Sequence, residues 1–211
     1  MKPAGMQASL AVVVGATGAF GRQIVARLLD RGLSVLAVAR TASSLAALEK
    51  AFPSIRPCIA DLASDAAIEA IAGAVDEPVR MVVHGPGVAV AGGILNAPTE
   101  AVVDAVNIKV GGMLRLVRAV DPWLGKSSRL VAIGGHYGFE PTAYAAAAGI
   151  ANAALANLMR QLSLVYGERG ITAHLIAPGP ADTDRLRRVA ADRATQRGTS
   201  VEQVMAEMVT E

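Results

Sequence analysis

Short apolar runs recur along the chain and alternate with amphipathic stretches. Each run is strand-sized and mostly apolar, which is typical of parallel strands that are buried on both faces of a sheet. The sequence therefore predicts six parallel strands, at Leu10–Val14, Ser34–Ala39, Ile55–Ala60, Val79–His84, Arg129–Ile133 and Ile171–Ile176.

The stretches between these runs carry helix formers with apolar residues at helical spacing. Their alternation with strands predicts an α/β fold, in which a doubly wound parallel sheet is covered on both faces to give a three-layer α/β/α sandwich. In such sheets, ligands bind beyond the carboxyl ends of the strands. We expect the helices near Phe20–Asp30, Ser43–Ala51, Asp65–Ala74, Thr99–Val120 and Ala143–Glu168.

The length of 211 residues suits a single domain that spans residues 1–211. After Thr183 the sequence becomes charged and continues without another strand-like run. Residues 184–211 are therefore expected to form a helical tail, which is either a solvated helical face or a mobile lid over a site.

Composition narrows the class of protein. Hydrophobic residues make up 53% of the chain and charged residues 18%, which excludes a disordered protein. No apolar run reaches the ~20 residues of a membrane-spanning helix, and the first residues lack the apolar core of a secretory signal, so we expect a cytoplasmic protein without membrane contact. The net charge is only +2 and aromatic residues make up 3%, so the chain lacks the positive charge and the stacking side chains typical of nucleic-acid binding, and we expect no nucleic-acid partner.

Metal binding is not expected. Cys58 is the only cysteine in the sequence, which excludes an intrachain disulfide and a thiolate metal cluster. The three histidines, His84, His136 and His174, lie in separate segments without the short spacing of paired metal ligands.

Glycines 15, 18 and 21 follow the first predicted strand, where the chain must turn sharply into a helix, and Thr17 and Phe20 lie in the same turn. Glycine lets backbone N–H groups approach a phosphate, and the helix N-terminus adds a partial positive charge. A glycine triplet alone is a common motif, but this strand, turn and helix context favours a Rossmann-like dinucleotide site.

Arg40 directly follows the second predicted strand, about 20 residues beyond the glycine loop, where an acidic residue would instead favour NAD(H). Its guanidinium, with Thr41 or Ser43, can pair with a 2′-phosphate, so NADP(H) is favoured over NAD(H). The alternative is an exposed loop arginine without this role. Asp61 follows the third strand, where it can accept the adenine amino group and can equally cap the helix that begins near Ser64, and the two roles are compatible.

From about Leu10 to Thr183 the sequence resembles the short-chain dehydrogenase/reductase family. The resemblance rests on the glycine loop, Ala60-Asp61-Leu62, Asn107 and Ala177-Pro178-Gly179-Pro180-Ala181-Asp182-Thr183, and it places Tyr144 at the position of the catalytic tyrosine. It implies a small-molecule substrate and a homodimer or homotetramer that forms through the helix after Tyr144. Together, the motifs and the resemblance assign cofactor binding to Gly15, Thr17, Gly18, Phe20, Gly21, Arg40, Asp61, Leu62, Gly85, Pro178, Gly179 and Thr183.

Several positions depart from the family pattern, and two of them affect the catalytic set: Ala148 stands where a lysine is expected, and Gly135 where a serine is expected. A lysine cation would lower the pKa of the tyrosine hydroxyl from its unperturbed value of about 10. Without it, Tyr144 is expected to be a poorer acid or base near neutral pH. His136 could replace the lost groups as a hydrogen-bond donor or proton relay, or it could be a structural or exposed histidine.

Three functions are consistent with these observations. The first is an NADP(H)-preferring oxidoreductase that acts on a small carbonyl or alcohol, with Tyr144 as proton donor or acceptor and Asn107 supporting a relay. The second is a catalytically silent relative that binds the dinucleotide as a sensor or as a partner subunit. The third uses the cofactor in a redox-neutral reaction with His136 as the base.

Overall fold

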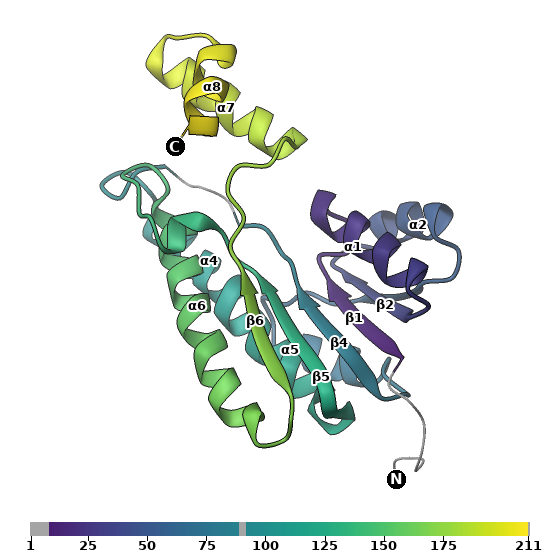
Figure 1. Ribbon diagram of the computed structural model, residues 1–211. Helices are drawn as coiled ribbons and strands as arrows, with labels where there is room; N and C mark the ends of the chain where they lie inside the picture. Colours follow the sequence, from purple (N-terminus) through teal and green to yellow (C-terminus); the bar gives the residue numbers. More distant parts are fainter. Residues whose placement is uncertain (1–8, 89–91, 211) are drawn as a thin grey trace. The chain divides into compact units, whose positions relative to one another are not determined.

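Six parallel strands form one sheet in the order β3-β2-β1-β4-β5-β6, which confirms the predicted doubly wound parallel sheet (Figure 1). The structure, a computed structural model, describes residues 9–88 and 92–210. The strands are β1 Leu10–Val14, β2 Ser34–Ala39, β3 Arg56–Ile59, β4 Val79–His84, β5 Leu124–Ile133 and β6 Thr172–Ile176.

Helices cover both faces of the sheet, and Figure 1 shows α4, α5 and α6 on one face and α1 and α2 on the other. Apolar side chains of α3, α5 and α6 form one core cluster with the strands, and those of α1 and α2 form a second. The helix bounds are α1 Ala19–Asp30, α2 Ala42–Ala51, α3 Ala66–Ala72, α4 Thr99–Val106, α5 Gly112–Val120 and α6 Ala146–Gly167.

One expected helix and one expected strand differ from the structure. The stretch predicted as one helix over 99–120 contains a π-helical turn, η1 Asn107–Gly111, between α4 and α5. The fifth strand begins at Leu124, before the predicted Arg129, because the Ser128 hydroxyl accepts from the backbone N–H of Gly125 and donates to the Val79 carbonyl. The Ser128 side chain thus stabilises the first part of β5, whose polar residues do not show the apolar pattern of a strand.

The chain divides into two compact units, residues 1–177 and 178–211. The second unit contains α7 Asp184–Arg197 and α8 Val201–Thr210, so the tail is helical as expected. The Thr183 hydroxyl caps α7 by accepting from the Leu186 N–H. Its role as a lid and the single-domain organisation stay predictions. Among the described helices of both units, none is long and apolar enough to cross a membrane.

The packing of α1 on the glycine loop gives a prediction at Gly21, where a Cβ would lie 2.1 Å from the carbonyl oxygen of Gly15. Gly21→Ala should therefore lower the free energy of unfolding by about 1–3 kcal/mol, the usual cost of overpacking. Gly167, in α6, is the matched control because a Cβ there would meet nothing within 4 Å. Gly167→Ala should be neutral or stabilising by up to about 1 kcal/mol. Equal effects of the two substitutions in urea denaturation would contradict this packing.

Candidate functional site

A cleft of about 490 Å³ lies beyond the carboxyl ends of β1, β2 and β4. This volume is in the range of small-molecule and cofactor sites. We call it the strand-end cleft. It brings together eight of the predicted site residues: Gly15, Thr17, Gly18, Arg40, Asp61, Leu62, Gly85 and Asn107.

The glycine loop, residues 15–21, exposes backbone without side chains at the N-terminus of α1. Gly15 has a φ of +77°, and a Cβ there would lie 2.9 Å from the carbonyl carbon of Gly85, so the chain can pass only without a side chain. No side chain caps the N-terminus of α1, which begins after Gly18. Its first N–H groups are therefore available to an anion. Phe20 is 45% exposed and does not line the strand-end cleft, and Gly21 is buried under the loop.

Arg40 is exposed at the end of β2 and lines the strand-end cleft. Within residues 9–88 and 92–210, no side chain or carbonyl forms a hydrogen bond or ion pair with its guanidinium. Thr41 caps α2 by accepting from the Ser44 N–H at 3.4 Å, and the Ser43 hydroxyl lies 3.5 Å from the Thr41 hydroxyl. A cation, two hydroxyls and a helix N-terminus thus lie next to one another.

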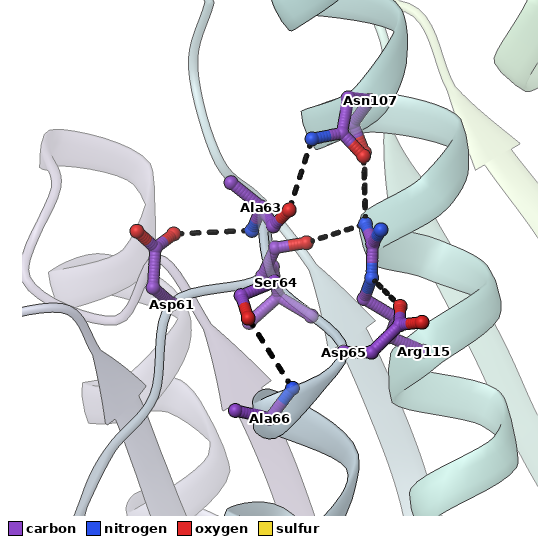
Figure 2. Close-up of polar contacts among 8 residues, drawn as sticks. Asp61, Ala63, Ser64, Asp65, Ala66, Asn107 and Arg115 are labelled. Carbon is purple, nitrogen blue, oxygen red and sulfur yellow. Dashed lines mark hydrogen bonds and ion pairs between the residues drawn. The ribbon is translucent and has the colours of Figure 1, made fainter.

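Asp61 closes a local turn rather than capping α3. Its Oδ1 accepts from the Ala63 N–H at 3.1 Å, whereas the Ser64 hydroxyl accepts from the Ala66 N–H at the start of α3 (Figure 2). The expected role of Asp61 as the cap of this helix is therefore wrong, because the Ser64 hydroxyl occupies that role. Its carboxylate stays in the lining of the strand-end cleft.

Asn107 and Arg115 hold the loop that carries Asp61 and Leu62 (Figure 2). The Asn107 side chain donates to the Ala63 carbonyl at 3.0 Å and accepts from the Arg115 Nη1 at 2.8 Å. The same Nη1 donates to the Leu62 carbonyl, also at 2.8 Å. The amide of Asn107 thus positions the cleft wall, and its role in a proton relay stays a prediction. The sequence reasoning missed Arg115, for which the only signal was a basic residue eight positions after Asn107 on an amphipathic helix.

A second group of functional candidates gathers between β5 and α6. The hydroxyls of Tyr137 and Tyr144 contact each other, and their rings meet edge to face with centroids 5.6 Å apart. We call these two residues the tyrosine pair. The ring of His136 lies on that of Tyr137, with centroids 3.9 Å apart. The structure therefore links His136 to Tyr144 through Tyr137, and none of the three lines the strand-end cleft.

Lys109 was not among the predicted site residues, yet it is only 4% exposed. Its Nζ donates to the carbonyl oxygen of Ile133, the last residue of β5, at 2.7 Å. Ala148, where the family pattern expects lysine, is buried in an apolar cluster against Ile108 of the same π-helical turn. A buried cation is thus present near the tyrosine-bearing segments, although on a different helix.

His84 is fully buried at the end of β4, and its Nε2 is hydrogen-bonded to the Ile108 carbonyl at 3.2 Å. Burial, with a smaller contribution from Lys109, lowers the pKa of His84 from 6.5 to about 3. The imidazole is therefore neutral at physiological pH and shielded from solvent. Among the residues that the structure describes, no three His, Cys, Asp or Glu side chains gather as metal ligands would; metal-free function stays a prediction.

Comparison with known proteins identifies similar sequences and folds. The model of the family described as short chain dehydrogenase matches residues 9–194. An uncharacterized oxidoreductase of Staphylococcus epidermidis is 26% identical over 180 residues, which cover 82% of this chain and 78% of the relative.

Two solved structures share the fold. Sorbitol-6-phosphate 2-dehydrogenase from Erwinia amylovora has a TM-score of 0.87 at 21% identity, over 95% of this chain and 83% of that chain. An NADPH-bound short chain oxidoreductase from Pseudomonas aeruginosa, described as containing an atypical catalytic center, has a TM-score of 0.78 at 21% identity, over 95% and 88% of the two chains.

The lowered pKa of His84 predicts a loss of stability in acid. Below pH 6.5 the unfolded chain takes up a proton that the folded chain binds only near pH 3, so folding loses free energy as the pH falls. Between pH 6.5 and 5 this amounts to about 2 kcal/mol. His84→Gln should remove that part of the pH dependence in urea denaturation, and His174→Gln, at an exposed site, should keep it. The same acid dependence in wild type and His84→Gln would contradict a buried neutral imidazole.

Proposed function

The chain belongs to the short-chain dehydrogenase family, and from that premise we propose that it is an NADP(H)-dependent oxidoreductase that interconverts a small carbonyl compound and its alcohol. The observation that carries the cofactor choice is Arg40, a cation at the end of β2 in the wall of the strand-end cleft. A 2′-phosphate would give this guanidinium a charge-assisted, bidentate partner. The NADPH-bound structure of the fold relative from Pseudomonas aeruginosa supports this choice.

The residues of the strand-end cleft fit a dinucleotide in this proposal. Gly15, Thr17 and Gly18, with the uncapped start of α1, hold the pyrophosphate. Asp61 and Leu62 bind the adenine end of the dinucleotide. Asn107 and Arg115 hold the loop that carries these two residues. Phe20 contributes through its backbone N–H, and Gly21 through the close packing of α1 on the loop.

Four further residues belong to the cofactor assignment. Gly85 lies directly against Gly15 and lines the strand-end cleft with it. Pro178, Gly179 and Thr183 lie at the start of the second unit, and the family resemblance assigns them to the nicotinamide end.

A dinucleotide held by the residues of the strand-end cleft would supply the hydride for the carbonyl carbon. Tyr144 then gives its hydroxyl proton to the carbonyl oxygen, so that an alcohol leaves and a tyrosinate stays. The Tyr137 hydroxyl, which contacts that of Tyr144, can return a proton, and the adjacent His136 can exchange it with solvent. In the reverse direction, Tyr144 accepts the proton of the alcohol.

A homodimer or homotetramer is part of this proposal. Leu164 and Val165, near the end of α6, are 81% and 69% exposed. Large apolar side chains exposed together are typical of protein interfaces. They lie on the helix that the family resemblance assigns to subunit contacts.

A catalytically silent dinucleotide-binding protein is the second candidate. The observation in its favour is Ala148, whose buried methyl group occupies the position of the expected lysine, together with Gly135 at the position of the expected serine. In that case the strand-end cleft binds NADP(H) tightly, and no carbonyl compound is reduced.

The choice of NADP(H) is tested at Arg40. Arg40→Ala should raise the Kd for NADPH about tenfold or more, because a charge-assisted hydrogen bond contributes about 1.5–3 kcal/mol, and it should leave the Kd for NADH unchanged. Arg160→Ala, at an exposed arginine of α6, is the control and should change neither value. An equal loss of affinity for both dinucleotides in fluorescence titrations would argue against a 2′-phosphate contact.

The catalytic proposal is tested at Tyr144. With NADPH and a panel of small aldehydes and ketones, Tyr144→Phe should lower turnover by about 10²–10⁴-fold and leave the Kd for NADPH unchanged. Tyr166→Phe is the matched control, because the Tyr166 hydroxyl donates to Asp121 near the other end of α6. Wild-type turnover in Tyr144→Phe would refute the assigned role. NADPH binding without turnover in the wild type would favour the silent candidate.

A further inference from the structure

Lys109 is the only charged side chain that is buried within residues 9–88 and 92–177. Placing an ammonium inside a protein costs free energy unless polar groups surround it. Its Nζ is held at the Ile133 carbonyl, at the carboxyl end of the sheet, where ligands of this fold class bind. A buried ammonium at this edge of the sheet therefore indicates a role that depends on its positive charge.

The surroundings of Lys109 connect it to the tyrosine pair. Ile133 ends β5, and three residues later the chain enters the short 3₁₀ turn His136–Gly138, which carries Tyr137. The Tyr137 hydroxyl contacts that of Tyr144, just before α6 begins. The π-helical turn η1, which carries Lys109, packs directly on α6.

The turn η1 also contacts the part of α6 where the family pattern expects lysine. Ile108, next to Lys109, packs in one apolar cluster with Ala147 and Ala148 of α6. The turn that carries Lys109 therefore packs on the segment that holds Ala148, while the Lys109 Nζ reaches the end of β5.

We propose that Lys109 is a positioning residue that supplies, from η1, the positive charge missing at Ala148, and that this charge favours the ionised form of the tyrosine pair. The proposal rests on the proposed function, because a proton-transferring Tyr144 needs its tyrosinate stabilised near neutral pH. An ammonium does this by Coulomb attraction, which is strong away from bulk water.

Other titratable groups around the pair do not supply this charge. His84 of β4 is neutral, because burial and Lys109 lower its pKa to about 3. Asp104 of α4 and Glu140, just after the 3₁₀ turn, are exposed carboxylates of the opposite sign. His136 lies against Tyr137 but is only half-buried, so it is not enclosed with the pair.

The test is an ultraviolet titration of tyrosinate absorbance on the full chain without ligands. The protein has three tyrosines, and burial and the hydrogen bond to Asp121 raise the pKa of Tyr166 to about 12. Any step at lower pH therefore belongs to the tyrosine pair. The wild type should show one step with a midpoint below the ordinary tyrosine value of about 10. Its disappearance in Tyr144→Phe or Tyr137→Phe assigns it.

Lys109→Met should raise that midpoint by about one pH unit or more, and Lys109→Arg should keep most of the wild-type value. Lys126→Met, at an exposed lysine of β5, is the matched control and should leave the midpoint unchanged. Circular dichroism reports whether each variant folds. A folded Lys109→Met with the wild-type midpoint would overturn the proposal. If Lys109→Met does not fold, the absence of any step below pH 10 in the wild type overturns it instead.

This titration uses neither cofactor nor substrate, so its failure differs from that of the proposed function. If the tyrosinate midpoint depends on Lys109 but the protein does not turn over NADPH, the oxidoreductase proposal is overturned and the proposal for Lys109 stands. Where turnover is measured, Lys109→Met should also move its pH profile towards higher pH. A purely structural lysine would lower activity without moving that profile.

Discussion

The structure depends most on the divergence of the chain between β1 and β4. These neighbouring strands send their connections to opposite faces of the sheet, because β2 pairs on one side of β1 and β5 on the far side of β4. The loops after β1 and β4 therefore separate at the carboxyl edge and leave the strand-end cleft. Gly15 and Gly85 allow the two loops to touch at its base, so the cleft begins at bare backbone.

Charge divides this carboxyl edge into two regions with different tasks. Arg40, at one end of the strand-end cleft, is exposed and ready to meet an anion from solvent. Lys109 is buried with its Nζ at the Ile133 carbonyl, at the end of β5, and the imidazole of His84, whose pKa it helps to lower, is kept neutral. In the proposed function the exposed cation serves recognition, whereas the buried one is proposed to act on groups inside the protein, where screening by water and salt is weak.

The sequence predicted the sheet well because its strands are continuous apolar runs, and such runs have few alternatives to a buried parallel sheet. The glycines and Arg40 in the cleft followed from the same logic, since the carboxyl ends of parallel strands meet at one edge, whereas Leu62 and Asn107 were found through the family resemblance. The start of β5 was missed because the Ser128 side chain supports a strand segment that is locally polar.

Lys109 and Arg115 could not be found in the same way. Both lie on amphipathic helical stretches where a basic residue usually faces solvent. Their importance depends on tertiary contacts with Ile133 and Leu62, which are distant along the chain. The family pattern also directed attention to Ala148, and only the packing of η1 on α6 shows that a cation is held on the facing turn.

The most direct test of the account is the binding of reduced dinucleotides to the wild-type protein, followed by fluorescence. The account predicts saturable binding of NADPH with clearly weaker binding of NADH, because the strand-end cleft combines a bare glycine loop with the guanidinium of Arg40. Failure of both dinucleotides to bind, or tighter binding of NADH, would contradict it.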